Sequence, residues 1–322
     1  MKPNVFVFSR LSDEHLAELS ERYQVTVLDP KGDIDAQYAA ALPSAQGMIG
    51  VGRKLGPAQL AQAGQLKVVS SISVGYDNYD LPYLTERGIM LTNTPDVLTE
   101  TTADLGFTLL MSAARRVPEL DAWTKAGHWQ RTVSPERFGV DIHHKTLGIV
   151  GMGRIGAAIA RRGHFGFNMP VLYTANSPKP ELEAELNARF CGLDELLQQA
   201  DFVVLVVPLG PQTRHLIGER QLAQMKASAI LVNVARGAVV DENALIAALE
   251  KGTIRGAGLD VYEREPLSDS PLFSLPNAVT LPHIGSATAQ TRDAMARLAL
   301  DNFHQAMAGQ RPANLVNDEI GS

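Results

Sequence analysis

The first hundred residues alternate short apolar runs with longer stretches of mixed polarity. The apolar runs, each bounded by turn residues, are 4–8, 25–28, 47–51 and 67–72. Runs of this kind are typical of strands buried on both faces of a parallel sheet. Helical stretches lie between them, and the first covers 12–19 with Ser12 as its N-cap. This alternation predicts a parallel α/β unit.

The same pattern returns from residue 146 onward. The predicted strands are 147–150, 171–173, 201–207, 230–234, 257–261 and 279–281, and helices are predicted at 181–188 and 241–250. A long helix at 99–115 precedes this second unit, and another at 287–307 follows it and is long enough to return to the first. The predicted fold class is therefore α/β, with two Rossmann-like or flavodoxin-like doubly wound parallel sheets.

Composition narrows the class of protein. A length of 322 residues suggests two domains, and a net charge of −6 argues against a nucleic-acid-binding surface. The single cysteine, Cys191, excludes an internal disulfide framework and a cysteine zinc site, and it fits a reducing compartment. No apolar stretch near the N-terminus is long enough for a signal peptide or membrane helix. We expect a cytoplasmic protein with no membrane partner.

Several polar residues are not assigned to a site. His143 and His144 are adjacent, but neighbouring side chains point apart and no third ligand is evident, so we expect a linker there and no metal. Asp104 and Asp121 are interpreted as solvated positions on helices. The segment 123–138 is richer in aromatic and arginine residues. Long connections in compact domains are usually functional or lie at interfaces, so we predict a dimer arm.

A glycine turn follows the strand at 147–150. Gly151, Gly153 and Gly156 stand at the spacing Gly-x-Gly-x-x-Gly, and apolar residues then recur at helical spacing. In such a turn the first glycine allows the tight bend, the second lets the backbone approach a pyrophosphate, and the third lets the helix pack close to the strand. The helix start also offers free N–H groups to phosphates. We predict dinucleotide binding here.

Polar residues follow three later strands directly. Arg236 follows 230–234, Glu263 and Glu265 follow 257–261, and His283 follows 279–281. Because ligands of doubly wound sheets bind outside the carboxyl ends of the strands, these side chains are expected at one edge. Taken singly, Arg236 could be an ion-pairing residue, His283 a structural one and each glutamate a solvated loop charge. Spacing alone does not choose between Glu263 and Glu265.

The chemistry of these residues is complementary. An arginine grips a carboxylate in a bidentate fork, and a histidine can donate a proton near neutral pH, which an adjacent carboxylate favours. Beside a reduced nicotinamide, this set predicts hydride transfer to a 2-keto acid. Arg236 would hold the acid and polarise the ketone, and His283 would protonate the developing alkoxide.

The residues after 171–173, the second predicted strand of the unit with the glycine turn, bear on which cofactor is bound. NAD selectivity comes from an acidic residue there that binds the ribose 2′-hydroxyl. No acid appears before Glu181, and Asn176, Ser177 and Lys179 could instead bind a 2′-phosphate. We therefore predict NADP(H) over NAD(H), with NADH still possible.

Four segments resemble the signatures of the D-2-hydroxyacid dehydrogenase family. They are 151–156, 233–237, 258–266 and 282–288. The segments 73–78, 97–104 and 143–148 further resemble the bacterial glyoxylate/hydroxypyruvate reductases that also act as 2-ketogluconate reductases. The resemblance covers essentially the whole chain. It implies an NADPH-dependent reductase that converts 2-keto acids to D-2-hydroxy acids.

The resemblance also implies roles for individual residues. Arg236 would bind substrate, His283 would be the acid/base, and Glu265, immediately before Pro266, would be its partner in preference to Glu263. Backbone atoms of Val74 and Gly75 would hold the substrate carboxylate. The implied cofactor contacts are Thr102, Gly151, Gly153, Arg154, Ile155, Gly156, Asn176, Ser177, Lys179, Pro208, Val234, Ala235, Asp260 and Ser286. Of these, Asp260 would sit near the nicotinamide amide and Pro208 on the adenosine side.

The resemblance implies an architecture as well. The substrate domain would be discontinuous, made of 1–98 and 286–322, with the NAD(P)-binding domain at 99–285 and the active site in a cleft between the two domains. Family members are usually homodimers through the nucleotide domain, and the arm from Trp129 to Phe138 could reach a partner's active site. Two alternatives share this scaffold, namely a phosphoglycerate dehydrogenase-like enzyme and a nucleotide-sensing corepressor that binds without turnover.

Overall fold

The structure is a computed structural model that describes residues 1–9 and 11–320. The chain divides into two compact units, Met1–Leu98 with Thr288–Ser322, and Thr99–Ala287. The expected second boundary, between 285 and 286, falls two residues earlier than the observed one. Thr288 is the N-cap of the last helix, and its side chain accepts a hydrogen bond from the Thr291 N–H, so the new unit begins where that helix begins. Residues 321 and 322 of the expected 286–322 segment lie outside the described residues.

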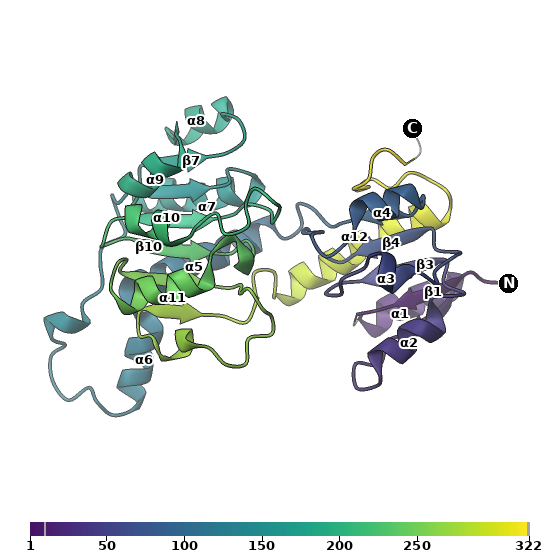
Figure 1. Ribbon diagram of the computed structural model, residues 1–322. Helices are drawn as coiled ribbons and strands as arrows, with labels where there is room; N and C mark the ends of the chain where they lie inside the picture. Colours follow the sequence, from purple (N-terminus) through teal and green to yellow (C-terminus); the bar gives the residue numbers. More distant parts are fainter. Residues whose placement is uncertain (10, 321–322) are drawn as a thin grey trace. The chain divides into compact units, whose positions relative to one another are not determined.

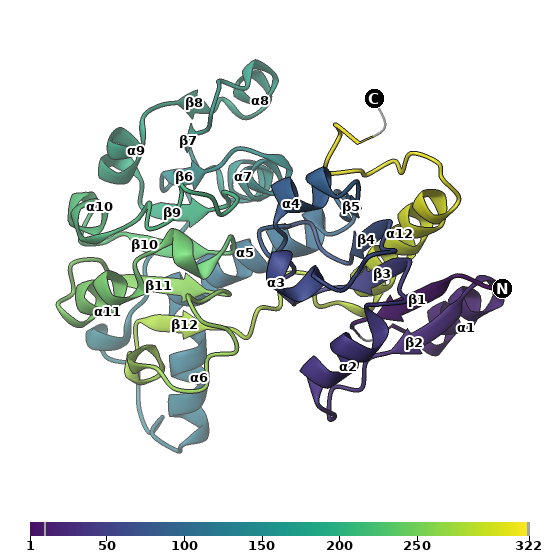
Figure 2. The same ribbon diagram turned by 45° about the vertical axis from the view of Figure 1, so that its right-hand side comes forward.

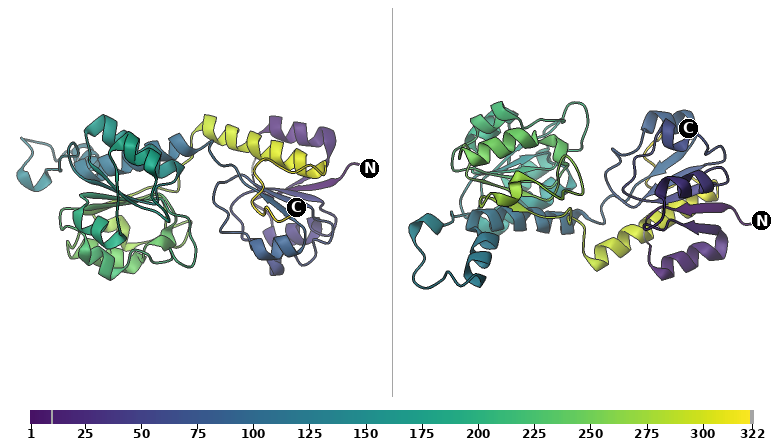
Figure 3. Two further views of the ribbon diagram at one scale, coloured as in Figure 1. Left: turned by 90° about the horizontal axis from the view of Figure 1, so that it is seen from above. Right: turned by 60° about the horizontal axis from the view of Figure 1, so that its bottom comes forward.

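The first unit is a five-stranded parallel sheet with the order β2-β1-β3-β4-β5. The strands are β1 (Asn4–Val7), β2 (Gln24–Val27), β3 (Gly47–Gly50), β4 (Val68–Ser71) and β5 (Met90–Thr92). The helices are α1 (Asp13–Arg22), α2 (Ile34–Ala41), α3 (Pro57–Leu60), α4 (Leu81–Glu86) and α12 (Ala289–Met307). The order is that of a flavodoxin-like sheet. Figure 3 shows α1 and α12 on one face and the other helices on the opposite face.

Helix α12 belongs to the first unit although it is the last helix of the chain. The Ser70 hydroxyl on β4 donates a hydrogen bond of 2.8 Å to the Ala299 carbonyl of α12. An added Cβ at Gly47 of β3 would lie 2.5 Å from the Phe303 ring, so only glycine allows this helix to approach the strand. On the other face, buried Phe6, Met48 and neighbouring residues form one hydrophobic core.

The second unit is a seven-stranded parallel sheet with the order β12-β11-β10-β9-β6-β7-β8, which can be followed in Figure 2. The strands are β6 (Leu147–Val150), β7 (Val171–Thr174), β8 (Arg189–Phe190), β9 (Phe202–Leu205), β10 (Ile230–Asn233), β11 (Gly256–Leu259) and β12 (Ala278–Thr280). The chain starts at β6, adds two strands to one side, and then returns to add β9 on the other. This is the Rossmann order with its switch point between β6 and β9, so the predicted doubly wound α/β class is confirmed.

Helices cover both faces of this sheet (Figures 1 and 3). The helices of the unit are α5 (Thr99–Arg115), α6 (Val117–Lys125), α7 (Arg154–Phe167), α8 (Pro180–Leu186), α9 (Leu193–Gln199), α10 (Glu219–Gln224) and α11 (Glu242–Glu250). One core contains residues of α5 and α7, and a separate core contains residues of α9, α10 and α11. Two cores on opposite faces explain why the strands are apolar throughout.

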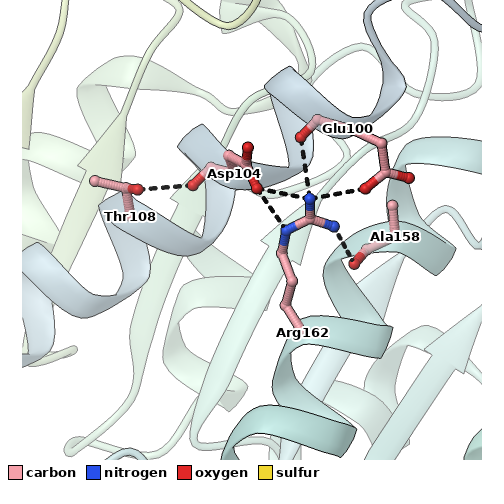
Figure 4. A network of polar contacts seen from close by, with 5 residues as sticks. All are labelled: Glu100, Asp104, Thr108, Ala158 and Arg162. Atoms are coloured by element: carbon pink, nitrogen blue, oxygen red, sulfur yellow. Dashed lines mark hydrogen bonds and ion pairs between the residues drawn. The ribbon is translucent and has the colours of Figure 1, made fainter.

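Helices α5 and α7 are joined by a polar network around Arg162 (Figure 4). The guanidinium donates to Asp104 Oδ1 through Nε at 2.8 Å and Nη2 at 2.6 Å, and to Glu100 Oε2 at 2.8 Å. Its Nη1 donates to the Ala158 carbonyl of its own helix. The interpretation of Asp104 as simply solvated was therefore incomplete: its side chain is exposed, but it fixes α7 against α5.

The predicted arm at 123–138 is not one extended connection. Its first residues, including Trp123, belong to α6, which begins after Arg116 in a left-handed conformation with φ of 54°. A short 3-10 helix, Pro135–Arg137, follows later. Helix α6 and the segment after it project from the second unit (Figure 1). The strands β5 and β8 and the helices α9 and α10 were not predicted. No helix among residues 1–9 and 11–320 has the length and apolarity required to span a membrane.

Candidate active site

The glycine turn connects β6 to α7. Gly151 has φ of +103°, and an added Cβ there would lie 2.7 Å from the Val206 carbonyl oxygen. An added Cβ at Gly156 would lie 2.2 Å from the Gly151 carbonyl oxygen, so strand and helix touch at this point. An added Cβ at Gly153 would have no atom within 4 Å. The turn therefore requires glycine at 151 and 156 to keep its shape, whereas at 153 the backbone faces open space.

The start of α7 fits a phosphate group. Gly153 is the N-cap, and no side chain caps the helix, so its first N–H groups are available to an anion. Arg154 is exposed and Ile155 half-buried at this helix start. An uncapped helix N-terminus next to open space at Gly153 is the arrangement that a dinucleotide pyrophosphate requires.

The loop after β7 lies beside the glycine turn, because β7 neighbours β6. Asn176 and Ser177 are exposed, and Lys179 is half-buried. The buried Tyr173 of β7 holds the loop: its hydroxyl accepts from the Lys179 N–H at 2.6 Å and donates to Glu183 at 2.7 Å. Along the chain, the first acidic residue after β7 is Glu181 on α8, which follows the three residues predicted to bind a 2′-phosphate.

The strand order brings the remaining predicted residues to the same edge. Strands β12, β11, β10 and β9 are successive neighbours in the sheet, and β9 is next to β6. Pro208 follows β9, Arg236 follows β10, Glu265 follows β11 and His283 follows β12. All strands of the sheet run parallel, so these loops share the edge that carries the glycine turn.

His283 and Glu265 form a direct pair. The distance from His283 Nδ1 to Glu265 Oε2 is 2.6 Å. The other carboxylate oxygen, Oε1, accepts the backbone N–H of Tyr262 at 2.9 Å. Burial raises the pKa of the Glu265 carboxyl, but the bonds from His283 and Tyr262, with the charges of His283 and Arg236, bring it below its ordinary value. Glu265 is therefore held as a carboxylate.

Glu263 has a different partner. Its Oε1 lies 2.6 Å from Nε2 of His215, on the loop that follows β9. Glu265, and not Glu263, contacts His283. Sequence spacing left this choice open because both glutamates lie on one short loop.

Arg236 stands on a turn that is fixed on both sides. The buried Asn233 side chain accepts the Ala235 N–H and donates to the Arg236 carbonyl, each at 3.0 Å. The Arg236 guanidinium donates to the Ala235 carbonyl, and its charge acts on Glu265. An added Cβ at Gly237 would lie 1.8 Å from the Tyr262 carbonyl carbon, so this turn lies directly against the Glu265 loop.

Asp260 is buried at the end of β11. Its two carboxylate oxygens accept the N–H groups of Ile284 and Gly285 at 2.7 and 2.8 Å. Burial raises its pKa above the ordinary value despite these bonds. An added Cβ at Gly285 would lie 3.2 Å from Asp260 and 3.5 Å from Thr102, which brings Thr102 of α5 to the same place. In this structure Asp260 holds the loop of His283 and Ser286.

The other predicted residues are placed as follows. Val234 and Ala235 are buried between β10 and Arg236, and the Pro208 carbonyl accepts the Thr213 hydroxyl at 2.6 Å. In the first unit, the Ser73 hydroxyl donates to the Gly75 carbonyl at 2.7 Å, and the Asn93 amide donates to the Val74 carbonyl at 2.9 Å. These two bonds fix the peptide planes of Val74 and Gly75.

Four residues that hold the site together were not predicted from the sequence. They are Tyr173, His215, Asn233 and Tyr262. Asn233 carried a usable signal, since it is a polar residue at the end of an apolar run directly before Val234. His215 carried none, because its partner is 48 positions away. Among residues 1–9 and 11–320, no group of three or more histidine, cysteine, aspartate or glutamate side chains is placed to hold a metal ion.

The fold and this edge together define a class of protein. A Rossmann sheet carries an uncapped glycine turn at its switch point, and neighbouring strands deliver an arginine and a histidine–glutamate pair to the same edge. This is the arrangement of a nicotinamide-dinucleotide-dependent oxidoreductase.

Comparison with known proteins identifies the family. The model of the D-isomer specific 2-hydroxyacid dehydrogenase, NAD binding domain, matches residues 107–285. Glyoxylate/hydroxypyruvate reductase B of Klebsiella pneumoniae subsp. pneumoniae is 51% identical over 322 residues, covering 99% of this chain and 100% of the relative. The chain belongs to the D-isomer specific 2-hydroxyacid dehydrogenase family. It is an enzyme, an oxidoreductase with an NAD(P)-binding domain.

Solved structures agree with this assignment. A protein of Thermus thermophilus superposes with a TM-score of 0.90 at 43% identity, covering 97% of this chain and 99% of that one. The NADPH-dependent glyoxylate/hydroxypyruvate reductase of Sinorhizobium meliloti, in complex with NADP and malonate, has a TM-score of 0.88 at 32% identity. That match covers 99% of this chain and 98% of the relative.

Proposed function

We propose that this enzyme is an NADPH-dependent reductase that converts 2-keto acids to D-2-hydroxy acids. The observation that carries the proposal is the His283–Glu265 pair beside Arg236, at the edge that also bears the glycine turn. Hydroxypyruvate and glyoxylate are proposed as substrates because relatives with these activities in their names are about half identical to the chain. The proposal of 2-ketogluconate rests on the sequence resemblance alone.

The residues would divide the work as follows. The glycine turn and α7 would hold the pyrophosphate, and Thr102, Val234, Ala235, Asp260 and Ser286 would surround the remainder of the dinucleotide. When bound, a reduced nicotinamide supplies the hydride. Arg236 would bind the substrate carboxylate and polarise the ketone. The backbone of Val74 and Gly75, in the first unit, is proposed as a further contact of the substrate carboxylate on the sequence resemblance alone.

His283 would deliver the proton. Its Nδ1 faces Glu265, which leaves Nε2 as the atom that serves the substrate. In reduction, the carbonyl carbon gains the hydride and the carbonyl oxygen gains the Nε2 proton, so His283 ends neutral. Glu265 stabilises the imidazolium before transfer and keeps the ring oriented.

The NADPH preference is a proposal about the loop after β7. Asn176, Ser177 and Lys179 would bind the 2′-phosphate. The segment between β7 and Glu181 contains no acidic side chain that would repel it. The Sinorhizobium meliloti relative, named NADPH-dependent and solved with NADP, supports this direction. The test is kcat/KM with each reduced cofactor, and a clear preference for NADH would overturn the proposal.

We also propose that the enzyme works as a homodimer in the cytoplasm. A hollow of about 740 Å³ on the second unit is lined by apolar residues, including Met111, Leu120 and Phe167, and by polar residues of α5 and α6, including Arg115 and Asp121. Val117, which also lines it, and Phe138 of the same unit are more than half exposed. A second copy of this chain would cover these side chains. Light scattering at assay concentration tests this, and a monomeric mass would contradict it.

The activity assay separates this proposal from its alternatives. We expect NADPH oxidation with hydroxypyruvate, glyoxylate and 2-ketogluconate, and none without a keto acid. Tight NADPH binding with no turnover on any of the three would favour a nucleotide sensor. Oxidation of 3-phosphoglycerate that exceeds all three reactions would favour the phosphoglycerate dehydrogenase-like alternative.

A further inference from the structure

A second histidine–glutamate pair lies next to the one assigned to catalysis. The His215 Nε2 to Glu263 Oε1 distance is 2.6 Å, equal to the distance between His283 Nδ1 and Glu265 Oε2. Glu263 and Glu265 lie two positions apart on the loop that follows β11. Nothing in the proposed reaction uses His215.

His215 is anchored to the turn that carries Arg236. Its backbone N–H donates to the Ala238 carbonyl at 2.8 Å, and the Ile217 N–H donates to the Val239 carbonyl at 3.1 Å. Ala238 and Val239 belong to the short 3-10 helix Gly237–Val239, which starts directly after Arg236. These two bonds attach the segment around His215 to the turn that carries Arg236.

Glu263 is anchored from three sides. Its carboxylate contacts His215, and its backbone N–H donates a hydrogen bond to Glu242 Oε2 at 3.1 Å. Its backbone also lies directly against Gly237, because a Cβ added to that glycine would be 2.3 Å from the Glu263 nitrogen. The adjacent Tyr262 N–H is the group that binds Glu265. A shift of Glu263 would therefore displace the donor that orients the Glu265 carboxylate.

We propose that His215 and Glu263 are positioning residues for the catalytic pair. By joining the Arg236 turn to the Glu265 loop, they keep Glu265 bound to His283 while Arg236 stays at its place. This inference rests on the proposed function of Arg236, Glu265 and His283. The two side chains are about 43% and 33% exposed, so their contact adds little to global stability. Their effect is on geometry, where displacements near 1 Å can cost about a hundredfold in rate.

The variants His215→Ala and Glu263→Ala test the proposal, with His215→Gln and Glu263→Gln as conservative replacements that keep a hydrogen-bonding group. His143→Ala is the matched control, because His143 is an exposed histidine of the same unit that lies 3.9 Å from a carboxylate of Asp141. In the two test variants we expect kcat for hydroxypyruvate to fall about tenfold or more, with KM for NADPH little changed. The conservative replacements should recover most of kcat, and the control should match the wild type.

A second measurement does not depend on turnover. Hydrogen–deuterium exchange of the peptide that contains the Tyr262 N–H should be faster in His215→Ala and Glu263→Ala than in the wild type, with the peptide around His143 unaffected. If His215→Ala fails to fold, Glu263→Ala alone decides the question. A wild-type enzyme without keto-acid turnover would defeat the proposed function, and the exchange data would still test the positioning.

Two results would overturn the inference. One is a kcat that equals the wild-type value in both test variants. The other is exchange at Tyr262 that equals the wild type in both, which would show that the loop keeps its place without the second pair.

Discussion

His283 presents Nδ1 to Glu265 Oε2 at 2.6 Å, and the two residues come from loops that follow neighbouring strands, β12 and β11. His283 itself adopts a left-handed conformation with φ of 52°. Asp260, between these loops, binds the two N–H groups that follow His283. The imidazole is thus oriented from its ring and from its backbone, which leaves Nε2 for the proposed proton transfer.

Replacing Glu265 should slow the reaction. Glu265→Gln removes the carboxylate that meets His283 Nδ1 at 2.6 Å and leaves a neutral amide of the same shape in its place. We expect kcat/KM for hydroxypyruvate to fall by about tenfold to a hundredfold. Steady-state kinetics with hydroxypyruvate and NADPH measure this. A kcat/KM equal to that of the wild type would separate Glu265 from the proton transfer.

The same substitution should alter stability against pH. The folded state lowers the pKa of Glu265 below its ordinary value of 4.5. The carboxylate therefore stabilises the fold fully above that value, and its contribution is lost as pH falls through the folded pKa. The Tm of the wild type should exceed that of Glu265→Gln at neutral pH, and the difference should shrink below pH 4.5. A difference that grows on acidification would contradict this.

The glycines of the turn should separate stability from cofactor binding. Gly156→Ala places a Cβ 2.2 Å from a backbone oxygen and should destabilise the enzyme by about 1–3 kcal/mol. Gly153→Ala meets nothing within 4 Å, so Tm should be kept while the affinity for NADPH falls. Gly166→Ala, also on α7 and in open space, is the control and should leave both unchanged. Full NADPH affinity in Gly153→Ala would show that the pyrophosphate binds elsewhere.

The network in Figure 4 should contribute to stability but not to chemistry. Arg162→Ala removes the bonds to Glu100 and Asp104, whose carboxylates are mostly exposed, so we expect a loss of about 1 kcal/mol. The control is Lys125→Ala, which breaks an exposed pair within one helix and should cost at most about 0.5 kcal/mol. Thermal unfolding compares the two. An equal loss of unfolding free energy in the two variants would mean that the contacts of Arg162 between α5 and α7 stabilise the fold no more than an exposed ion pair does.

Strand patterns predicted most of the architecture, and the strand ends predicted which side chains meet at one edge. The convergence of Arg236, His283 and a glutamate followed from the parallel sheet, because neighbouring parallel strands end at the same edge. The choice of Glu265 over Glu263 came from the family resemblance and not from the strands. The two-residue strand Arg189–Phe190 was missed because both of its residues are exposed and give no apolar run. Helix α9 was missed because the preceding strand was absent from the prediction.

The contacts that orient the site could not be read from spacing. His215 with Glu263, and Tyr173 with the Lys179 N–H, depend on how loops pack after the sheet has formed. Asp104 was interpreted as solvated because its partner Arg162 lies on another helix, 58 positions away. Patterns along the chain report periodicity and burial, and they do not report which polar groups meet across loops.

The most direct test of the account is the rate of hydroxypyruvate reduction by His283→Asn. Asparagine tolerates the left-handed backbone of this position, so the loop should keep its shape while the proton donor is lost. We predict that kcat falls by about 10²- to 10⁴-fold while the affinity for NADPH is retained. A kcat within about threefold of the wild type would contradict the assignment of His283 as the proton donor.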